Sequence, residues 1–516
     1  MKPFTSFKRV DLFFGIVGIV AVIWLAIIAA PYGRSDHVDT FWFARLYQDL
    51  FLHRGLWEDW YFAPVPNYFP EIFLYFTISS FGLSFEYTTI AYSVAVLALT
   101  SALALKLAHR LLEARSQLPA LVVALVFPVL LIASGEDLTN WSRNTIHYGA
   151  FFNLFFSICV MQCMSDADHF KLKTALFFLV VMLGSMSDFL FIPIFLAGAF
   201  GWLIIAYVFC GLRKDRGLVV GFTSIAGVTA GVLLYFLVTP NAYDNPVWAS
   251  GISLRTAFSS IEPHIRALQF LLDHLLARPY ILIALLILCF SVTVSTLRSG
   301  HRHHHRLPVY AFVLLGIVAN LYVFGLGAEK SALNRYTVFA TNISLFILSL
   351  TLASAIDYIG RRVNKSTLIH RAQIGLIIAT CGLLVYSDLT NSENSKARFS
   401  NQLDTVACIQ NATTNRGLRT GLADYDWATR LTVLSGGLIY LWPVRGNSLE
   451  FLPWLATKNG WEDREIEFVV ARTQTDPAIY QSKSLTYPLA VDKATNGLGV
   501  PLDSIVCSDL TILIYR

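Results

Sequence analysis

The sequence predicts a mainly α-helical protein, a polytopic bundle of about eleven transmembrane helices followed by a C-terminal α/β extracytoplasmic domain. Long apolar segments recur throughout residues 1–388, whereas residues 389–516 contain no further run long enough to cross a bilayer. Only 14% of the residues are charged, compared with roughly 25% in soluble domains. A charge at the bilayer centre costs several kcal/mol, so this deficit is typical of helices that face lipid.

The expected spans follow from length, because a spanning helix needs roughly 20 predominantly apolar residues. The first candidate is too long to be only a cleaved signal peptide. Residues 174–211 form either two spans or one long broken span, and residues 71–83 are short enough to be a re-entrant or interfacial segment. The candidate spans are 11–31, 86–107, 118–134, 149–164, 174–188, 189–211, 217–239, 280–297, 307–328, 336–358 and 373–388.

The distribution of Lys and Arg predicts the orientation of the chain. Basic residues concentrate in the N-terminal segment and in alternate loops, which we therefore assign to the cytoplasm. An odd number of spans then leaves the C-terminal domain outside. The cluster from His301 to Arg306 can bind a metal, but we interpret it as a cytoplasmic anchor and expect no metal site. The net charge of +5 is spread over such loops and does not indicate a nucleic-acid partner.

The C-terminal domain has a mixed pattern. Runs rich in aliphatic and aromatic residues predict strands at Val433–Val444, Ile466–Ala471 and Leu510–Tyr515, and helices are expected near Gln402–Gln410 and Asp424–Thr432. At about 128 residues the domain is long enough for its own core.

Two of the seven cysteines, Cys408 and Cys507, lie near the two ends of this domain. The other five fall in expected spans. In an oxidising compartment such a pair forms a disulfide, and the alternative is two free buried thiols. We expect the disulfide.

The first outside loop, residues 32–71, is unusually acidic. Asp36 and Asp39 directly follow the first span, and their spacing puts them on one face if the segment is helical. A carboxylate at a membrane boundary can act as a general base, and the alternative is a solvated loop in which Asp36 caps a helix. Further acids in the same loop are Asp49, Glu58, Asp59 and Glu71.

The same loop is rich in aromatic residues, including Trp57 and Trp60. Such rings either stack on sugars or form a belt at the membrane interface. The run from Pro64 to Glu71 contains three prolines and forces a non-helical backbone. Near a membrane such a backbone is tolerated where it lines a cavity or is buried in protein, which favours a site.

Other polar residues are expected at the outer surface. Asp188 lies where the chain turns between two spans and can be a simple turn cap. Arg335 and Tyr336 begin the tenth span, where the arginine either holds a phosphate or snorkels. Arg143 and His147 lie together in the second outside loop. Residues 261–276 have an amphipathic pattern typical of a helix lying along the interface.

At these residues the sequence resembles the GT-C class of integral membrane glycosyltransferases. The likeness rests on the acidic loop Ser35-Asp36-His37-Val38-Asp39, on Pro70-Glu71, on Arg335-Tyr336 and on the outside C-terminal domain. Within the class, the layout looks most like bacterial serotype-converting O-antigen glucosyltransferases. The stretch Gly421–Trp427, followed by Leu434-Ser435, also resembles a segment of poorly characterised bacterial membrane proteins of this layout.

This resemblance implies an inverting glycosyltransferase in a bacterial inner membrane that acts at the periplasmic face on a glycan or glycolipid acceptor. The donor is then a polyprenyl-phosphate sugar, so no nucleotide or other cofactor is expected. Asp36 or Asp39 would be the catalytic base, and the choice between them stays open. Arg335, with Tyr336 and Arg143, would bind the donor phosphate. The residues expected to contact substrate are Trp57, Trp60, Glu71, His147 and Asp188.

Three other functions fit a membrane protein of this layout. A transporter or flippase of glycan precursors is expected to have ionisable residues within its spans and internal repeats, and we find few of the former and no clear repeat. A polymerase or ligase of lipid-linked glycans shares an outside site. A non-catalytic assembly protein would use the C-terminal domain to bind a partner.

Overall fold

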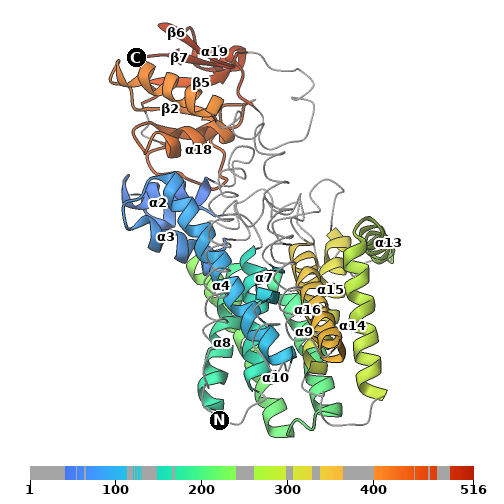
Figure 1. The fold of residues 1–516 in the computed structure, drawn as a ribbon. Coiled ribbons are helices and arrows are strands. Elements are labelled where there is room, and N and C mark those ends of the chain that lie inside the picture. Colours follow the sequence, from blue (N-terminus) through green and yellow to red (C-terminus); the bar gives the residue numbers. More distant parts are fainter. Residues whose placement is uncertain are drawn as a thin grey trace.

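The fold was obtained as a computed structural model and is mainly helical, with one five-stranded sheet near the C-terminus (Figure 1). Apart from isolated residues between 120 and 130, the residues that the structure describes are 41–53, 55–62, 66–112, 148–164, 169–239, 261–297, 306–327, 337–363, 400–446, 448–462, 465–473 and 488–516.

Within these residues, five helices are long and apolar enough to cross a membrane, and a sixth span results if the bent pair α13–α14 is counted as one. The apolar stretches of α7 and α15 are shorter. The helices of the bundle are α4 (Phe85–Leu112), α7 (Tyr148–Met164), α8 (Phe170–Ser187), α9 (Phe191–Phe209), α10 (Lys214–Val238), α13 (Glu262–Ala277), α14 (Pro279–Leu297), α15 (Leu307–Gly327) and α16 (Val338–Val363).

The structure decides one of the ambiguous segments. Residues 174–211 form two helices, α8 and α9, which are separated by a short turn at Asp188. The segment 71–83 contains α3 (Phe73–Ser79), whose seven residues are too few to cross a bilayer. The expected spans 11–31 and 373–388, most of 118–134 and the domain boundary at 388 lie outside the described residues.

Small residues allow the bundle helices to approach closely, as is common in membrane proteins. A Cβ atom at Gly231 of α10 would lie 2.7 Å from the Ser185 side chain of α8. A Cβ atom at Gly198 of α9 would likewise lie 2.7 Å from the Phe312 ring of α15. Larger residues at either position would force the helix pair apart.

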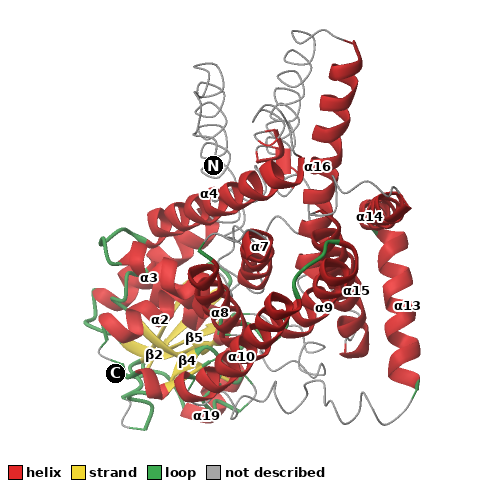
Figure 2. Cartoon of the chain, turned by 90° about the horizontal axis from the view of Figure 1, so that it is seen from below, coloured by secondary structure: helices red, strands yellow, loops and turns green. Residues whose placement is uncertain are grey.

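The amphipathic helix expected over residues 261–276 is α13. It meets α14 at an angle of 101°. Figure 1 shows α13 end-on and α14 lengthwise, whereas Figure 2 shows the reverse, so α13 lies across the end of the bundle. Leu268, Leu272 and Leu276 are exposed on one side, and Ala267 is buried. The exposed leucines suit a helix that lies at the level of the lipid headgroups.

The first outside loop folds into short elements between the bundle and the sheet (Figure 1). Its helix α2 contacts α3 on one side and α18 of the C-terminal region on the other. The elements are α2 (Trp42–Phe51), the 3-10 helix η3 (Trp57–Asp59), β1 (Trp60–Tyr61), the π-helical turn η4 (Tyr68–Ile72) and α3.

The C-terminal sheet has the strand order β3-β2-β5-β7-β6. β2 runs parallel to β3 and β5, and β7 is antiparallel to β5 and β6. Helix α18 connects β2 to β3. The elements are β2 (Thr420–Asp424), α18 (Tyr425–Leu434), β3 (Tyr440–Val444), β4 (Ala456–Thr457), β5 (Phe468–Arg472), α19 (Val491–Leu498), β6 (Asp503–Cys507) and β7 (Leu510–Ile514).

The strand predicted over Val433–Val444 was too long. Val433 and Leu434 end α18, and only residues 440–444 form β3. The error arises because β-branched and aromatic residues are equally suited to a buried helix end. The structure joins Cys408, on the helix over residues 400–414, to Cys507 of β6 by a disulfide, with Cα atoms 5.9 Å apart.

Candidate functional site

The proline-rich end of the first outside loop is a fixed, buried turn. Asn67 has a left-handed conformation (φ 52°), and the Phe69–Pro70 peptide bond is cis. The Asn67 and Phe69 amides donate to the backbone oxygen and the hydroxyl of Ser187, at 3.1 and 2.8 Å. Asn153 of α7 donates to the Phe69 carbonyl at 2.9 Å. The turn is thus anchored to the ends of two bundle helices. The predicted non-helical backbone is found at Phe69, whereas the residues beside it belong to the π-helical turn η4.

This turn directs Glu71 into the protein interior at the N-terminus of α7. The side chain is 1% exposed. Its Oε1 accepts a hydrogen bond from the Gly149 amide at 2.5 Å, and a Cβ atom at position 149 would collide with the carboxylate. Its Oε2 receives no hydrogen bond from any residue that the structure describes.

Burial raises the pKa of Glu71 to about 8. Desolvation is the largest cause, and the nearby Asp188 carboxylate adds to it, whereas the Gly149 amide acts in the opposite direction. At neutral pH the side chain is therefore mainly protonated, and it can donate a hydrogen bond as well as accept one.

Asp188 is where the sequence predicts it, in the turn between α8 and α9. It is 1% exposed, and its Oδ1 accepts a hydrogen bond from the Leu190 amide at 2.8 Å. The residue therefore caps the turn, as one of the two sequence-based readings expects. Its neighbour Ser187 binds the turn that carries Glu71, so Asp188 lies beside the same buried site.

Trp57 fixes the loop to the end of α10. Its indole donates to the Val238 carbonyl at 2.7 Å, and its ring lies 4.7 Å from Phe62 and 6.0 Å from Tyr68. The Tyr68 hydroxyl is 2.7 Å from the hydroxyl of Thr239. In this conformation these aromatic side chains pack against one another.

Trp60 is completely buried. It lies in β1, which pairs with β4 of the C-terminal region so that Trp60 is opposite Thr457. This position connects the first outside loop to the C-terminal region rather than offering an open ring face.

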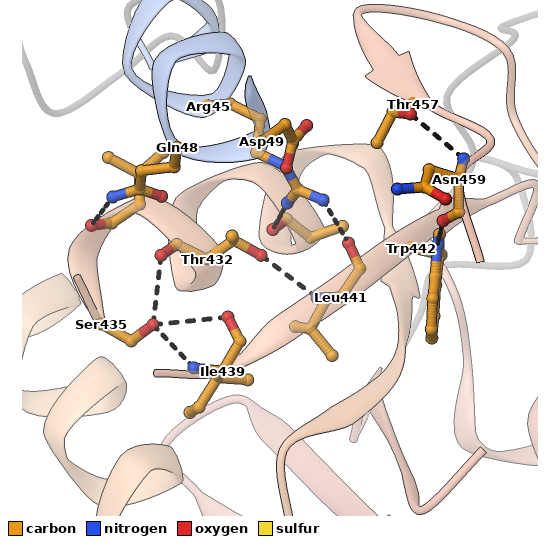
Figure 3. A network of polar contacts seen from close by, with 12 residues as sticks. Arg45, Gln48, Asp49, Thr432, Ser435, Ile439, Leu441, Trp442, Thr457 and Asn459 are labelled. Carbon is orange, nitrogen blue, oxygen red and sulfur yellow. Dashed lines mark hydrogen bonds and ion pairs between the residues drawn. The ribbon is translucent and has the colours of Figure 1, made fainter. Parts of the chain in front are cut away.

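A second buried cluster joins the same two parts of the chain (Figure 3). Arg45 donates to both carboxylate oxygens of Asp49, at 3.1 Å each, and its other two nitrogens donate to the carbonyls of Ala428 and Leu441. Its guanidinium carbon also lies 4.4 Å from the centre of the Tyr440 ring. The first loop and the C-terminal sheet region are therefore on the same side of the bundle.

The sequence analysis noted Asp49 only as one of several acids and missed Arg45. The available signal was their spacing of four residues, which brings two side chains together on a helix. Burial raises the pKa of Asp49 to about 6, although the Arg45 charge opposes the change.

Asp424 is a third buried acid, at the end of β2. It caps α18 by accepting a hydrogen bond from the Trp427 amide at 3.0 Å, and it also accepts one from the Leu489 amide. Burial raises its pKa to about 6. It belongs to the stretch Gly421–Trp427 that the sequence analysis singled out, and here it has a structural role.

Asp36, Asp39, Arg143, His147, Arg335 and Tyr336 lie outside the described residues. In the part of the chain that is described, no group of three or more His, Cys, Asp or Glu side chains is arranged to hold a metal ion.

No protein-family model matches the sequence, and a search of curated proteins finds no match. Among solved structures, the chain is similar to ArnT from Cupriavidus metallidurans, which was crystallised with bound undecaprenyl phosphate. The TM-score is 0.57, the match covers 97% of this chain and 98% of that chain, and 12% of the residues are identical.

The likeness extends over nearly the whole of both chains, so it includes the bundle and the C-terminal region. The chain therefore has the GT-C fold, and the fold class predicted from the sequence is confirmed. The comparison does not single out the O-antigen glucosyltransferases within this class.

Proposed function

We propose that the protein is a membrane glycosyltransferase that moves a sugar from a polyprenyl-phosphate donor to a cell-surface glycan or glycolipid. The observation that carries this proposal is the shared fold with a protein that binds undecaprenyl phosphate. A second supporting observation is the buried first-loop acid Glu71, whose Oε2 receives no hydrogen bond from any described residue.

Chain connectivity supports one site around Glu71. Asp39 is two residues before Phe41, the first described residue of this loop. Two residues later, the Phe43 ring lies 5.8 Å from Tyr75, one helical turn beyond Glu71. The described chain that follows the acidic segment thus packs against α3.

The same reasoning applies to the residues assigned to the donor phosphate. His147 is two residues before Gly149, which binds Glu71. Arg335 is four residues before Phe339. The Phe339 ring lies 6.5 Å from Phe151, near the start of α7. The described residues that follow Arg335 and His147 in the sequence thus lie near the start of α7, where Glu71 is bound.

The proposed reaction is an inverting substitution. Asp36 or Asp39 accepts the proton of an acceptor hydroxyl, whose oxygen forms a bond to the anomeric carbon. The bond from that carbon to the phosphate oxygen breaks, and its electron pair stays on the polyprenyl phosphate. Arg335, with Tyr336 and Arg143, stabilises the phosphate as its negative charge develops. Neutral Glu71 donates a hydrogen bond through Oε2 to a substrate oxygen.

We assign the reaction to the periplasmic face of a bacterial inner membrane. The assignment depends on the bias of Lys and Arg between loops. Helix α2 contacts the C-terminal region, so the two parts lie on one side of the bundle. An even number of spans must therefore separate them, which together with the first span supports an odd total.

The test uses the purified full chain in detergent. The donors are polyprenyl-phosphate glucose, galactose and mannose, each with a labelled sugar, and the acceptor is the cell envelope of a gene-deletion strain. We expect label to enter envelope glycan, and we expect Asp36→Asn combined with Asp39→Asn to lower the rate by about 10² or more. Glu58→Gln, which changes an exposed acid of the same loop, is the control and keeps the wild-type rate. Wild-type activity in the double variant would show that neither Asp36 nor Asp39 is the catalytic base.

A further inference from the structure

A groove of about 370 Å³ lies between the first outside loop and the C-terminal region. Glu71 is not among the residues that line it. Helices α2 and α3 and the start of α4 form one wall. The opposite wall comes from the C-terminal region, through Leu403, Val433, Leu434 and Gly436. The groove therefore exists only because the two parts of the chain are docked together.

One side chain in the groove has an unused hydrogen-bonding group. Gln48 is 9% exposed, and its amide nitrogen donates to the Val433 carbonyl at 3.3 Å. Its Oε1 receives no hydrogen bond from any described residue. A buried amide oxygen without a donor is unfavourable, so a ligand hydroxyl that reached Oε1 would remove this penalty.

The remaining lining combines aromatic rings and small polar groups with the aliphatic side chains of Ala44, Leu52 and Leu83. Tyr47, Tyr75 and Phe85 contribute the rings, and Ser79 and Thr88 contribute hydroxyls. Ser84 and Glu86 add further polar groups at the start of α4. A polyprenyl chain has no hydrogen bonds to offer such groups, whereas a sugar has hydroxyls around a largely apolar ring. The lining therefore suits a carbohydrate better than a lipid tail.

The groove is aligned with the proposed reaction site. Glu71, Tyr75 and Ser79 are spaced four residues apart, so they share one face of the helix that begins in η4. All three are buried. Two turns, roughly 11 Å, separate Glu71 from Ser79. A chain of sugars in the groove would thus lead towards Glu71.

We propose that this groove binds the glycan chain of the acceptor, with Gln48 and the aromatic rings as contacts and the C-terminal region as one wall. The inference rests on the proposed function, and it gives the C-terminal region a role in acceptor binding. Donor binding does not involve the groove.

The test adds a side chain at Gly436, which lines the groove. Its φ is +67°, and a Cβ atom there meets nothing within 4 Å. Gly417 is a matched control outside the groove, because it also follows a helix, has a φ of +70° and has open space around a Cβ atom. Gly436→Gln and Gly417→Gln therefore carry the same backbone strain, and only the first fills the groove.

The glycan probe is fluorescein-labelled polysaccharide released by mild acid from the envelope of the gene-deletion strain. Its binding to the full chain in lipid nanodiscs is followed by fluorescence anisotropy, and binding of undecaprenyl phosphate is followed by native mass spectrometry. We expect Gly436→Gln to weaken polysaccharide binding at least about fivefold, a loss of about 1 kcal/mol. Undecaprenyl phosphate binding stays unchanged in both variants, and Gly417→Gln binds both ligands like the wild type.

The inference is wrong if the wild type does not bind the polysaccharide, or if Gly436→Gln binds it as tightly as the wild type. It is also wrong if Gly436→Gln loses undecaprenyl phosphate instead, because the groove would then serve the lipid. Failure of the proposed function is distinguishable: the wild type would bind polysaccharide through the groove but transfer no sugar.

Discussion

The Arg45 guanidinium lies 3.1 Å from the Asp49 carboxylate, and both side chains are almost completely buried where α2 meets the C-terminal region. Arg45 also donates to two carbonyls of that region. The pair thus fills a polar interface whose groups satisfy one another, and removing one partner leaves the other charge buried without compensation.

We therefore expect Asp49→Asn to destabilise the protein by about 3–5 kcal/mol, because the Arg45 charge loses its counter-ion. Replacing both residues, Arg45→Met with Asp49→Leu, restores much of the loss since no buried charge remains. Thermal unfolding of the purified protein in detergent measures both effects. The exposed pair Arg213 and Asp215 is the control, and Asp215→Asn changes the melting temperature little. Equal melting temperatures for Asp49→Asn and Asp215→Asn would contradict the assigned role.

Glu71 predicts a dependence of stability on pH. Its pKa is about 8 in the folded protein, above the ordinary value of 4.5, so the folded state binds more protons than the unfolded state between these values. The contribution of Glu71 to the free energy of unfolding is therefore fully present below about pH 4.5. It is lost as the pH rises through about 8. In Glu71→Gln this dependence is absent, so the melting temperature of the variant minus that of the wild type should increase from pH 5 to pH 9. A constant difference would mean that the Glu71 pKa is not raised.

The rate of sugar transfer should also depend on the protonation of Glu71. If neutral Glu71 donates a hydrogen bond to substrate, wild-type transfer falls on the alkaline side with an apparent pKa near 8. Glu71→Gln keeps a donor at every pH and loses this alkaline limb, whereas Glu71→Ala is impaired throughout. An unchanged alkaline limb in Glu71→Gln would show that another group titrates there.

The Glu71 carboxylate packs so closely against α7 that position 149 has no room for a side chain. A Cβ atom there would collide with the carboxylate, so Gly149→Ala should destabilise the protein by about 1–3 kcal/mol. Gly221→Ala in α10 is the matched helical control, since the nearest atom to its Cβ would be 3.8 Å away. Thermal unfolding of the two variants compares them directly, and equal stability would argue against a tight contact at Gly149.

The fold class could be predicted from the sequence because lipid imposes a strong pattern: apolar length, scarce charge and basic loops on one side. The turn at Asp188 and the short helix after Glu71 could be anticipated in position. The docking of the first loop on the C-terminal region could not, because Arg45 and Asp49 look like any surface pair at helical spacing. Their burial depends on Tyr440, Ala428 and Leu441, which are distant in sequence.

The disulfide between Cys408 and Cys507 closes a loop with a sequence separation of 99 residues. Replacing both cysteines by serine should destabilise the C-terminal region by about 2–4 kcal/mol, since a long loop gains conformational freedom when unfolded. Cys289→Ser removes an exposed free cysteine and is the control. Reductant should lower the melting temperature of the wild type and of Cys289→Ser, but not that of the double variant. Insensitivity of the wild type to reductant would contradict a stabilising bridge.

The most direct measurement of the central claim is the balance of products formed by the wild-type protein. The full chain is incubated with a labelled polyprenyl-phosphate sugar and envelopes of the gene-deletion strain, and both the glycan and the lipid are analysed by mass spectrometry. The account predicts one free polyprenyl phosphate for each sugar added to the glycan, with the backbone length of the glycan unchanged. Lengthened glycan chains, or lipid-linked sugar that crosses the membrane without being cleaved, would contradict it and indicate a polymerase or a flippase.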